Sequence, residues 1–118
     1  MSPATKDSWK RLPLPERREP LSFPGFYTDA RADLMCLGHV PRDMDDKWFV
    51  YAEEGWVYFH RNWTGACIFA LKLDGSPVGV RVLDSWVSRD EKQYTSKDAE
   101  QDRKLLAGVI EHYFPDEK

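Results

Sequence analysis

Residues 60–65, with the sequence His-Arg-Asn-Trp-Thr-Gly, combine several side chains that are suited to binding a ligand. An arginine guanidinium forms paired hydrogen bonds with phosphate or carboxylate groups, and an indole ring offers a face for stacking. Asparagine, threonine and a glycine turn add polar groups close to the backbone. This composition predicts a site for an anionic or planar ligand, made by His60, Arg61, Asn62, Trp63 and Thr64.

The same run also has a purely structural interpretation. Trp63 would cap the core, Arg61 would stack on its ring as a cation–π pair, and His60 would form a hydrogen bond with a carbonyl. Thr64 and Gly65 would then supply only turn geometry. The two interpretations differ in whether Trp63 is exposed and in whether a carboxylate inside the fold pairs with Arg61.

Catalytic motifs are scarce in the rest of the chain. It has no G-x-S-x-G sequence and no glycine-rich phosphate loop. His60 would form an acid–base pair with Asp84 or Glu53 only if the sheet brought them together. The sequence therefore names no catalytic residue.

Two groups of residues have the chemistry of metal ligands. A zinc site would need Cys36, His39, His60 and Cys67, but both cysteines lie in apolar stretches, where cysteine behaves as a small hydrophobe. The acidic residues Asp43, Asp45 and Asp46 lack the glycine and distal glutamate of a calcium-binding loop. We expect a solvated acidic loop there, and neither a metal nor a cofactor.

Strands on both sides of the 60–65 run must position it. Aromatic and β-branched residues separated by turn residues predict strands over 47–52, 56–61, 66–73, and from 78 to 83 or 87. Gly55 supplies the positive φ of the first hairpin turn, and residues 74–77 are expected to form the third. Alternation in the second strand puts Trp56, Tyr58 and His60 on one face and Val57, Phe59 and Arg61 on the other.

Helices are predicted before and after these strands. The first covers residues 29–37, with a cap at Thr28 or Asp29 and an end at Gly38. Its expected apolar face is Ala30, Leu34 and Leu37. The second begins near Ser96 or Lys97 and ends before Pro115. Its apolar stripe at helical spacing is Leu105, Leu106, Val109, Ile110, Tyr113 and Phe114.

The first 24 residues hold five of the eight prolines, which excludes a helix or a central strand there. We expect an extended Pro-rich arm over 1–24 that lies on the domain from about Leu12, after a mobile start. Residues 25–118 should form a single α+β domain. The order α-β-β-β-β-α predicts an antiparallel four-stranded meander sheet with two flanking helices.

Composition narrows the class of protein. Of 118 residues, 42% are hydrophobic, which excludes a wholly disordered chain, and no apolar run is long enough to span a membrane. The N-terminus lacks the apolar region of a secretory signal. A net charge of −3 argues against general nucleic-acid binding. Together with free cysteines, these features favour the cytoplasm.

Two stretches carry a resemblance to a known family. Residues 44–51, Met-Asp-Asp-Lys-Trp-Phe-Val-Tyr, and residues 60–65 resemble the motif D-D-K-W-F-x-Y … H-R-[SN]-W-T-G of a family of small bacterial proteins with no assigned activity. The resemblance covers about residues 43–70, and Asn62 stands where serine is usual. It implies a bacterial cytosolic protein and supplies no mechanism.

We therefore expect a non-enzymatic binding or interaction module with its site at the turn between the second and third strands. Its partner would be a protein or an anionic small molecule. One alternative is a small hydrolase or transferase for a nucleotide-like substrate, in which Arg61 holds phosphate, Trp63 stacks on the base and His60 is the acid–base group. Another is a structural homodimer, because five tryptophans are many for this length and aromatic residues concentrate at interfaces.

Overall fold

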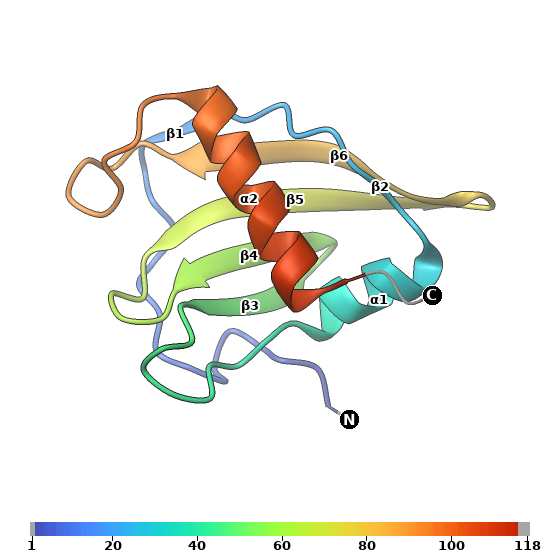
Figure 1. Cartoon of the computed structure of the whole chain (residues 1–118), viewed down its shortest axis with the longest axis horizontal. Helices are drawn as coiled ribbons and strands as arrows, with labels where there is room; N and C mark the ends of the chain where they lie inside the picture. The colour runs from blue at the N-terminus through green and yellow to red at the C-terminus, as the bar shows by residue number, and fades with distance from the viewer. Residues whose placement is uncertain (1, 116–118) are drawn as a thin grey trace.

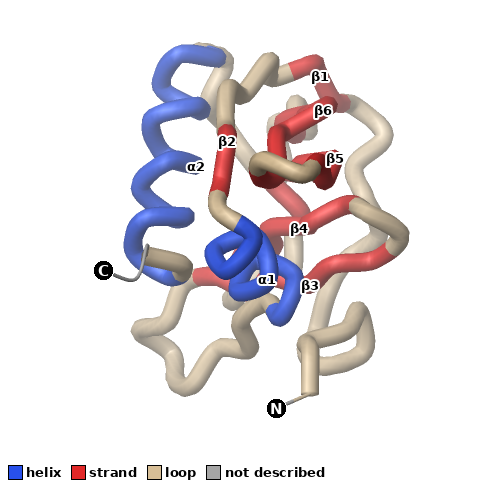
Figure 2. Tube along the Cα trace, turned by 90° about the vertical axis from the view of Figure 1, so that its right-hand side faces the viewer, coloured by secondary structure: helices blue, strands red, loops and turns tan. Residues whose placement is uncertain are grey.

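The computed structural model of the chain describes residues 2–115, which form a sheet crossed on one face by a long helix. The elements are β1 (Arg18–Pro20), β2 (Phe26–Tyr27), α1 (Asp29–Leu37), β3 (Trp48–Glu53), β4 (Trp56–Arg61), β5 (Cys67–Ser76), β6 (Gly79–Ser88) and α2 (Ala99–Tyr113). The strand order is β1-β6-β5-β4-β3, and β2 also pairs with β6. Figures 1 and 2 show α2 lying across one side of this sheet. The predicted α+β domain with an antiparallel meander and two helices is confirmed.

The meander strands lie within a few residues of the predicted ones, except at the third turn. The first hairpin turns at Glu54 and Gly55, which both have positive φ. At the third hairpin, however, β5 continues through Ser76, and Asp74 pairs with Arg81 across the ladder. The prediction of a turn over 74–77 was wrong for residues 74–76, which stay paired with β6, and the turn itself lies at Pro77 and Val78. The resulting long β5–β6 hairpin projects from the body of the molecule (Figure 1).

The N-terminal arm, residues 2–24, belongs to the folded body. Its β1 pairs with the end of β6, so the sheet has more strands than the predicted four. Leu21 and Phe23 follow β1 and are buried in the core. Even the start of the arm is held, because Ala4 is buried and its N–H donates a 2.7 Å hydrogen bond to the carbonyl of Leu37. The expected mobile start before Leu12 is therefore not observed.

The main core lies between the sheet and α2. Val57 and Phe59 of β4 face it, and so does Phe69 of β5. Leu106 and Ile110 of α2 are buried against this layer. On the opposite face of the sheet, a smaller cluster contains Ala4, Phe49, Tyr51 and Tyr58. The alternation predicted for β4 therefore holds, with apolar residues toward α2.

Helix α1 begins as predicted, with the Thr28 side chain accepting a hydrogen bond from the N–H of Arg31. Its buried face is Arg31, Ala32 and Met35, whereas Ala30 is exposed. The predicted buried face, which began at Ala30, was wrong by one position, because the buried residue at the start of the helix is Arg31. Its guanidinium donates to the Phe114 carbonyl and pairs with Glu111 at 2.6 Å, joining α1 to the end of α2.

Helix α2 is capped by Asp98 and anchored to the sheet by a buried carboxylate. Asp102 is inaccessible to solvent, and it pairs with Arg89 at 2.9 Å and accepts a 2.5 Å hydrogen bond from Tyr94. Arg89 also pairs with Glu19 of β1 at 3.2 Å. These contacts fix the loop between β6 and α2. No helix within the described residues is both long and apolar enough to cross a membrane.

Candidate functional site

The turn between β4 and β5 sends the predicted site residues to opposite sides of the sheet. The turn closes with a 2.9 Å hydrogen bond from the N–H of Gly65 to the carbonyl of Arg61. Gly65 has a φ of 77°, and an added Cβ would lie 3.1 Å from Arg11 of the arm that crosses it. His60 and Asn62 lie on the side of the sheet that the arm covers. Arg61, Trp63 and Thr64 line a hollow together.

His60 is fully buried and so cannot contact a ligand at the surface. Its Nδ1 donates a 2.8 Å hydrogen bond to the Gly65 carbonyl, and its ring stacks on Tyr51 with centroids 5.4 Å apart. Burial lowers the pKa of His60, more than the hydrogen bond to Gly65 raises it. The residue is therefore a neutral core histidine, as in the structural interpretation.

Asn62 is also buried and has a structural role. Its side-chain oxygen accepts a 2.7 Å hydrogen bond from the indole nitrogen of Trp9. Its amide nitrogen donates to the backbone carbonyls of Asp43 and Asp46, at 3.2 and 2.8 Å. All of these bonds lie inside the fold, so the Asn62 side chain is engaged in linking the arm and the 43–46 loop to the turn.

Arg61 stacks its guanidinium over the ring of Trp48, 4.9 Å from the centroid. The cation–π pair of the structural interpretation thus exists, but with Trp48 in place of Trp63. No carboxylate within residues 2–115 pairs with Arg61. Stacking fixes the plane of the guanidinium while leaving its edge donors free to bind an anion.

Trp63 is 63% exposed, so it does not cap the core. Its indole nitrogen donates a 2.7 Å hydrogen bond to the carbonyl of Met44, which holds the ring against the 43–46 loop. Thr64 is exposed beside it, and its hydroxyl oxygen accepts a 3.2 Å hydrogen bond from the N–H of Ala66. The indole is therefore held in position while much of its surface remains available.

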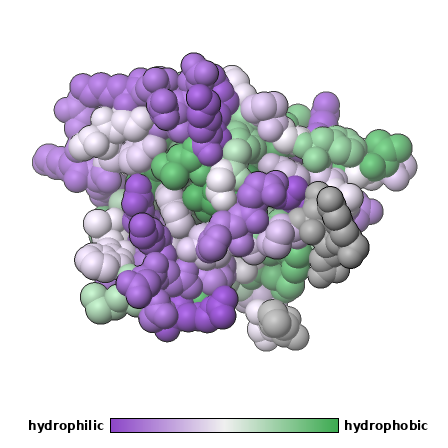
Figure 3. Space-filling view, in the orientation of Figure 1, coloured by the Kyte–Doolittle hydropathy of each residue, from purple (hydrophilic) through white to green (hydrophobic). Residues whose placement is uncertain are grey.

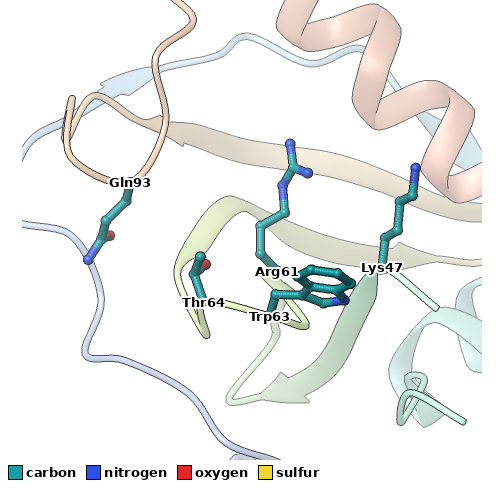
Figure 4. Close-up of a pocket in the computed structure, with 5 residues that line it drawn as sticks. All are labelled: Lys47, Arg61, Trp63, Thr64 and Gln93. Atoms are coloured by element: carbon teal, nitrogen blue, oxygen red, sulfur yellow. The ribbon is translucent and has the colours of Figure 1, made fainter. Parts of the chain in front are cut away.

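A hollow of about 330 Å³ brings these three residues together with two that lie outside the predicted site, Lys47 and Gln93. In Figure 4 the Arg61 and Lys47 side chains extend in the same direction, with the Trp63 ring between their bases and Gln93 on the far side. The side-chain oxygen of Gln93 is buried without a hydrogen-bond partner in the described chain. The lining thus contains two cations, an indole face and polar groups, but no carboxylate.

Lys47 had a weak sequence signal, because it begins the strand predicted over 47–52 and lies in the motif of residues 44–51. Gln93 had none: it reaches the hollow from the loop between β6 and α2, which the Arg89–Asp102 pair holds in place. Only the packing of that loop brings residue 93 near residues 61–64.

Two further hollows follow the first, of which the second adjoins the first and the third adjoins the second. One of about 450 Å³ lies against α2 and shares Lys47 with the first hollow. The other, of about 370 Å³, shares Asp45, His112 and Tyr113 with the α2 hollow. It is lined by His39, whose Nε2 lies 2.6 Å from a carboxylate oxygen of Asp46.

Asp46 is the carboxylate around which this third hollow is organised. Burial would raise the pKa of Asp46, but hydrogen bonds from Tyr113, His39 and the N–H of Arg42 together lower it. The Tyr113 hydroxyl donates at 2.7 Å. The prediction of a solvated acidic loop was therefore wrong for Asp46, which joins the loop to His39, just after α1, and to Tyr113 of α2.

The cysteines are free and differently placed. Cys36 is exposed on α1, contrary to its predicted burial, whereas Cys67 is buried on β5 and burial raises its thiol pKa. Within residues 2–115, no three side chains of histidine, cysteine, aspartate or glutamate gather as a metal site. Comparisons of the chain with protein-family models, with curated proteins and with solved structures found no match.

Proposed function

We propose that the chain is a non-enzymatic interaction module that binds an anionic group beside a planar one in the hollow at Lys47, Arg61 and Trp63. The observation that carries the proposal is the pair of cations, free of any carboxylate partner among the described residues, next to an exposed indole. The stacked Arg61 and the ammonium of Lys47 would bind the anion. The Trp63 ring would take the planar group by stacking.

Two features support a recognition role for these residues. A 63% exposed tryptophan contributes little to the core, and the guanidinium of Arg61 makes no ion pair within the described fold. Neither is needed to satisfy a buried charge. The resemblance to small bacterial proteins and the two free cysteines extend the proposal to a bacterial cytoplasm.

Titration of the ¹⁵N-labelled chain with phenyl phosphate and with AMP tests this function. Both probes combine an anion with a planar ring, and amide shifts should concentrate at residues 47, 61–64 and 93. Arg61→Ala and Trp63→Ala should each weaken binding by about 1–3 kcal/mol while leaving thermal unfolding nearly unchanged. Arg81→Ala is the matched control, because Arg81 is exposed and pairs with Asp74 on the distant hairpin. Shifts elsewhere, or equal losses in all three variants, would refute the site.

One observation favours the enzymatic alternative, a hydrolase or transferase for a nucleotide-like substrate. The buried His60 is unsuited to acid–base chemistry, but His39 is paired with Asp46 and lines the third hollow, which adjoins the one along α2. A carboxylate on one ring nitrogen leaves the other as a base. Incubation with p-nitrophenyl phosphate and nucleotide esters tests it: turnover that disappears in His39→Gln would support catalysis, and no turnover would exclude these substrates.

The homodimer alternative rests on a different surface. Phe26 of β2, Val78 at the tip of the β5–β6 hairpin and Leu83 of β6 are 60%, 81% and 53% exposed. Figure 3 also shows hydrophobic residues at the edge of the α2 side, toward this hairpin. Exposed apolar patches often mark protein interfaces. Sedimentation equilibrium at tens of micromolar chain distinguishes a dimer from a 13.8 kDa monomer.

A further inference from the structure

We infer that the anion-binding hollow continues along α2 as a groove for an acidic, partly apolar peptide segment of a partner protein. The inference rests on the proposed function at one end of the groove. It extends that function by naming the class of partner and a second contact surface, which the predicted site did not include.

The groove is the hollow of about 450 Å³ between α2 and the beginning of β3. It begins at Lys47, which also lines the anion-binding hollow, so one ligand would contact both. Leu105 projects into this region and is 38% exposed, and Val109 lies beside it. The helix surface here is therefore partly apolar, unlike the hydrophilic residues that dominate the same face in Figure 3.

Gly108 lies in the middle of α2 and lines the groove. Glycine inside a helix costs about 1 kcal/mol relative to alanine. Nothing in the fold requires it, because a Cβ added at this position would meet no atom within 4 Å. The missing side chain leaves bare helix backbone facing the groove, which allows a second backbone to approach closely.

The charges along the groove favour an acidic occupant. Lys47 has no ion pair within the described residues, and the Lys104 ammonium lies 3.9 Å from Glu100 with both side chains about 70% exposed. Such exposed pairs are weak. Among the lining residues Asp45 is the one carboxylate, against two lysines and His112. The groove therefore presents cations on an apolar floor.

A peptide fits this surface better than a nucleic acid does. Binding to single-stranded nucleic acid relies on exposed aromatic faces along a basic channel. Here the α2 part offers aliphatic contacts and bare backbone, and Trp48 is only 5% exposed.

Selection of a random 16-residue peptide display library against the intact chain tests the inference. Enriched peptides should combine acidic with apolar residues, and their affinity should fall at least tenfold in Lys104→Glu and in Gly108→Leu. Lys97→Glu and Ala107→Leu are the matched controls. Lys97 lines a different hollow, and Ala107 is exposed on the same helix without lining the groove. The controls should bind as the parent does.

The outcomes separate the groove from the proposed function. If no acidic peptide is enriched, or if fluorescein-labelled dT15 displaces the peptides, the inference fails. Peptides that no longer bind Arg61→Ala, but bind Gly108→Leu as they bind the parent, would contradict the groove and support the anion-binding hollow alone. Peptides that no longer bind Gly108→Leu, but bind Arg61→Ala and Trp63→Ala as they bind the parent, would contradict the proposed function and support the α2 groove alone.

Discussion

The indole nitrogen of Trp9 donates a 2.7 Å hydrogen bond to the side-chain oxygen of Asn62, which joins the N-terminal arm to the turn between β4 and β5. The same asparagine amide donates to two carbonyls of the 43–46 loop. One side chain thus links three segments that lie far apart in the sequence. The exposed Trp63 is bonded to Met44 of that loop, so the position of the hollow that Trp63 lines depends on the buried Asn62.

Replacing this asparagine should therefore destabilise the fold. Asn62→Ala leaves a partly buried indole N–H and two carbonyls without their partners, at a cost of about 2–3 kcal/mol in the free energy of unfolding. Trp9→Phe removes one of these bonds at a more exposed position and should cost about 1 kcal/mol. Urea unfolding of both single variants and the double variant measures the coupling. Strictly additive losses would show that the Trp9–Asn62 bond contributes nothing.

Truncating the arm should lower the free energy of unfolding, and the longer deletion should lower it more. Deleting residues 1–8 removes Ala4 from the cluster with Phe49 and Tyr51, and we expect a loss of about 1–2 kcal/mol. Deleting residues 1–24 also removes Leu21 and Phe23, whose burial is worth about 1.5–3 kcal/mol each. Thermal unfolding compares the two. A chain that tolerates both deletions equally would contradict the packing of the arm.

Gly108→Ala should raise the free energy of unfolding by about 1 kcal/mol, because the new methyl group meets open space and alanine favours the helix. The reciprocal change, Ala107→Gly, should lower it by about 1 kcal/mol at an adjacent exposed position of α2. Denaturant titration of the two variants measures both effects. Destabilisation by Gly108→Ala would mean that position 108 is constrained by contacts other than those described.

Acid should weaken the fold first through His60. Burial lowers its pKa from the ordinary 6.5, so below that pH the unfolded chain binds a proton that the folded chain does not. The free energy of unfolding should therefore decrease as the pH falls below 6.5. His60→Phe removes this dependence and keeps a ring in the core. The Gly65 carbonyl would retain its bond from the N–H of Leu12. An unchanged slope between about pH 5 and 7 in His60→Phe would refute this assignment.

Protonation of Asp46 should destabilise the fold at a lower pH than protonation of His60. Its pKa is lowered in the fold, so its contribution is complete above the ordinary value of 3.8 and is lost as the pH falls through the lowered pKa. Asp46→Asn should reduce stability near neutral pH and flatten the decline below about pH 4. Acid titration followed by tryptophan fluorescence compares the two chains. A parallel decline in both would show that other carboxylates are responsible.

Local sequence patterns determined much of the fold but only part of the site. Strand alternation correctly placed His60 and Arg61 on opposite faces of β4, because side-chain direction in a strand depends on neighbours in the sequence. Which face of the sheet is buried depends on the arm, and no residue near Gly65 in the sequence predicts that the arm crosses there. For this reason His60 and Asn62, which were predicted to bind a ligand, are buried instead. Gln93 was missed for a similar reason, since its position depends on the distant pair between Arg89 and Asp102.

The two short strands of the arm have a consequence for association between chains. The outer edge of β6 is ten residues long, and an open edge of that length is a template for uncontrolled pairing with other chains. β1 and β2 occupy this edge near its two ends, and the backbone between them breaks regular pairing where Ser22 has a φ of 52°. Pro20 and Pro24 lack the N–H that a neighbouring strand would need. By pairing with β6, the arm blocks the addition of strands from other chains in an amyloid-like manner. Chains that lose the arm should therefore aggregate even before they unfold.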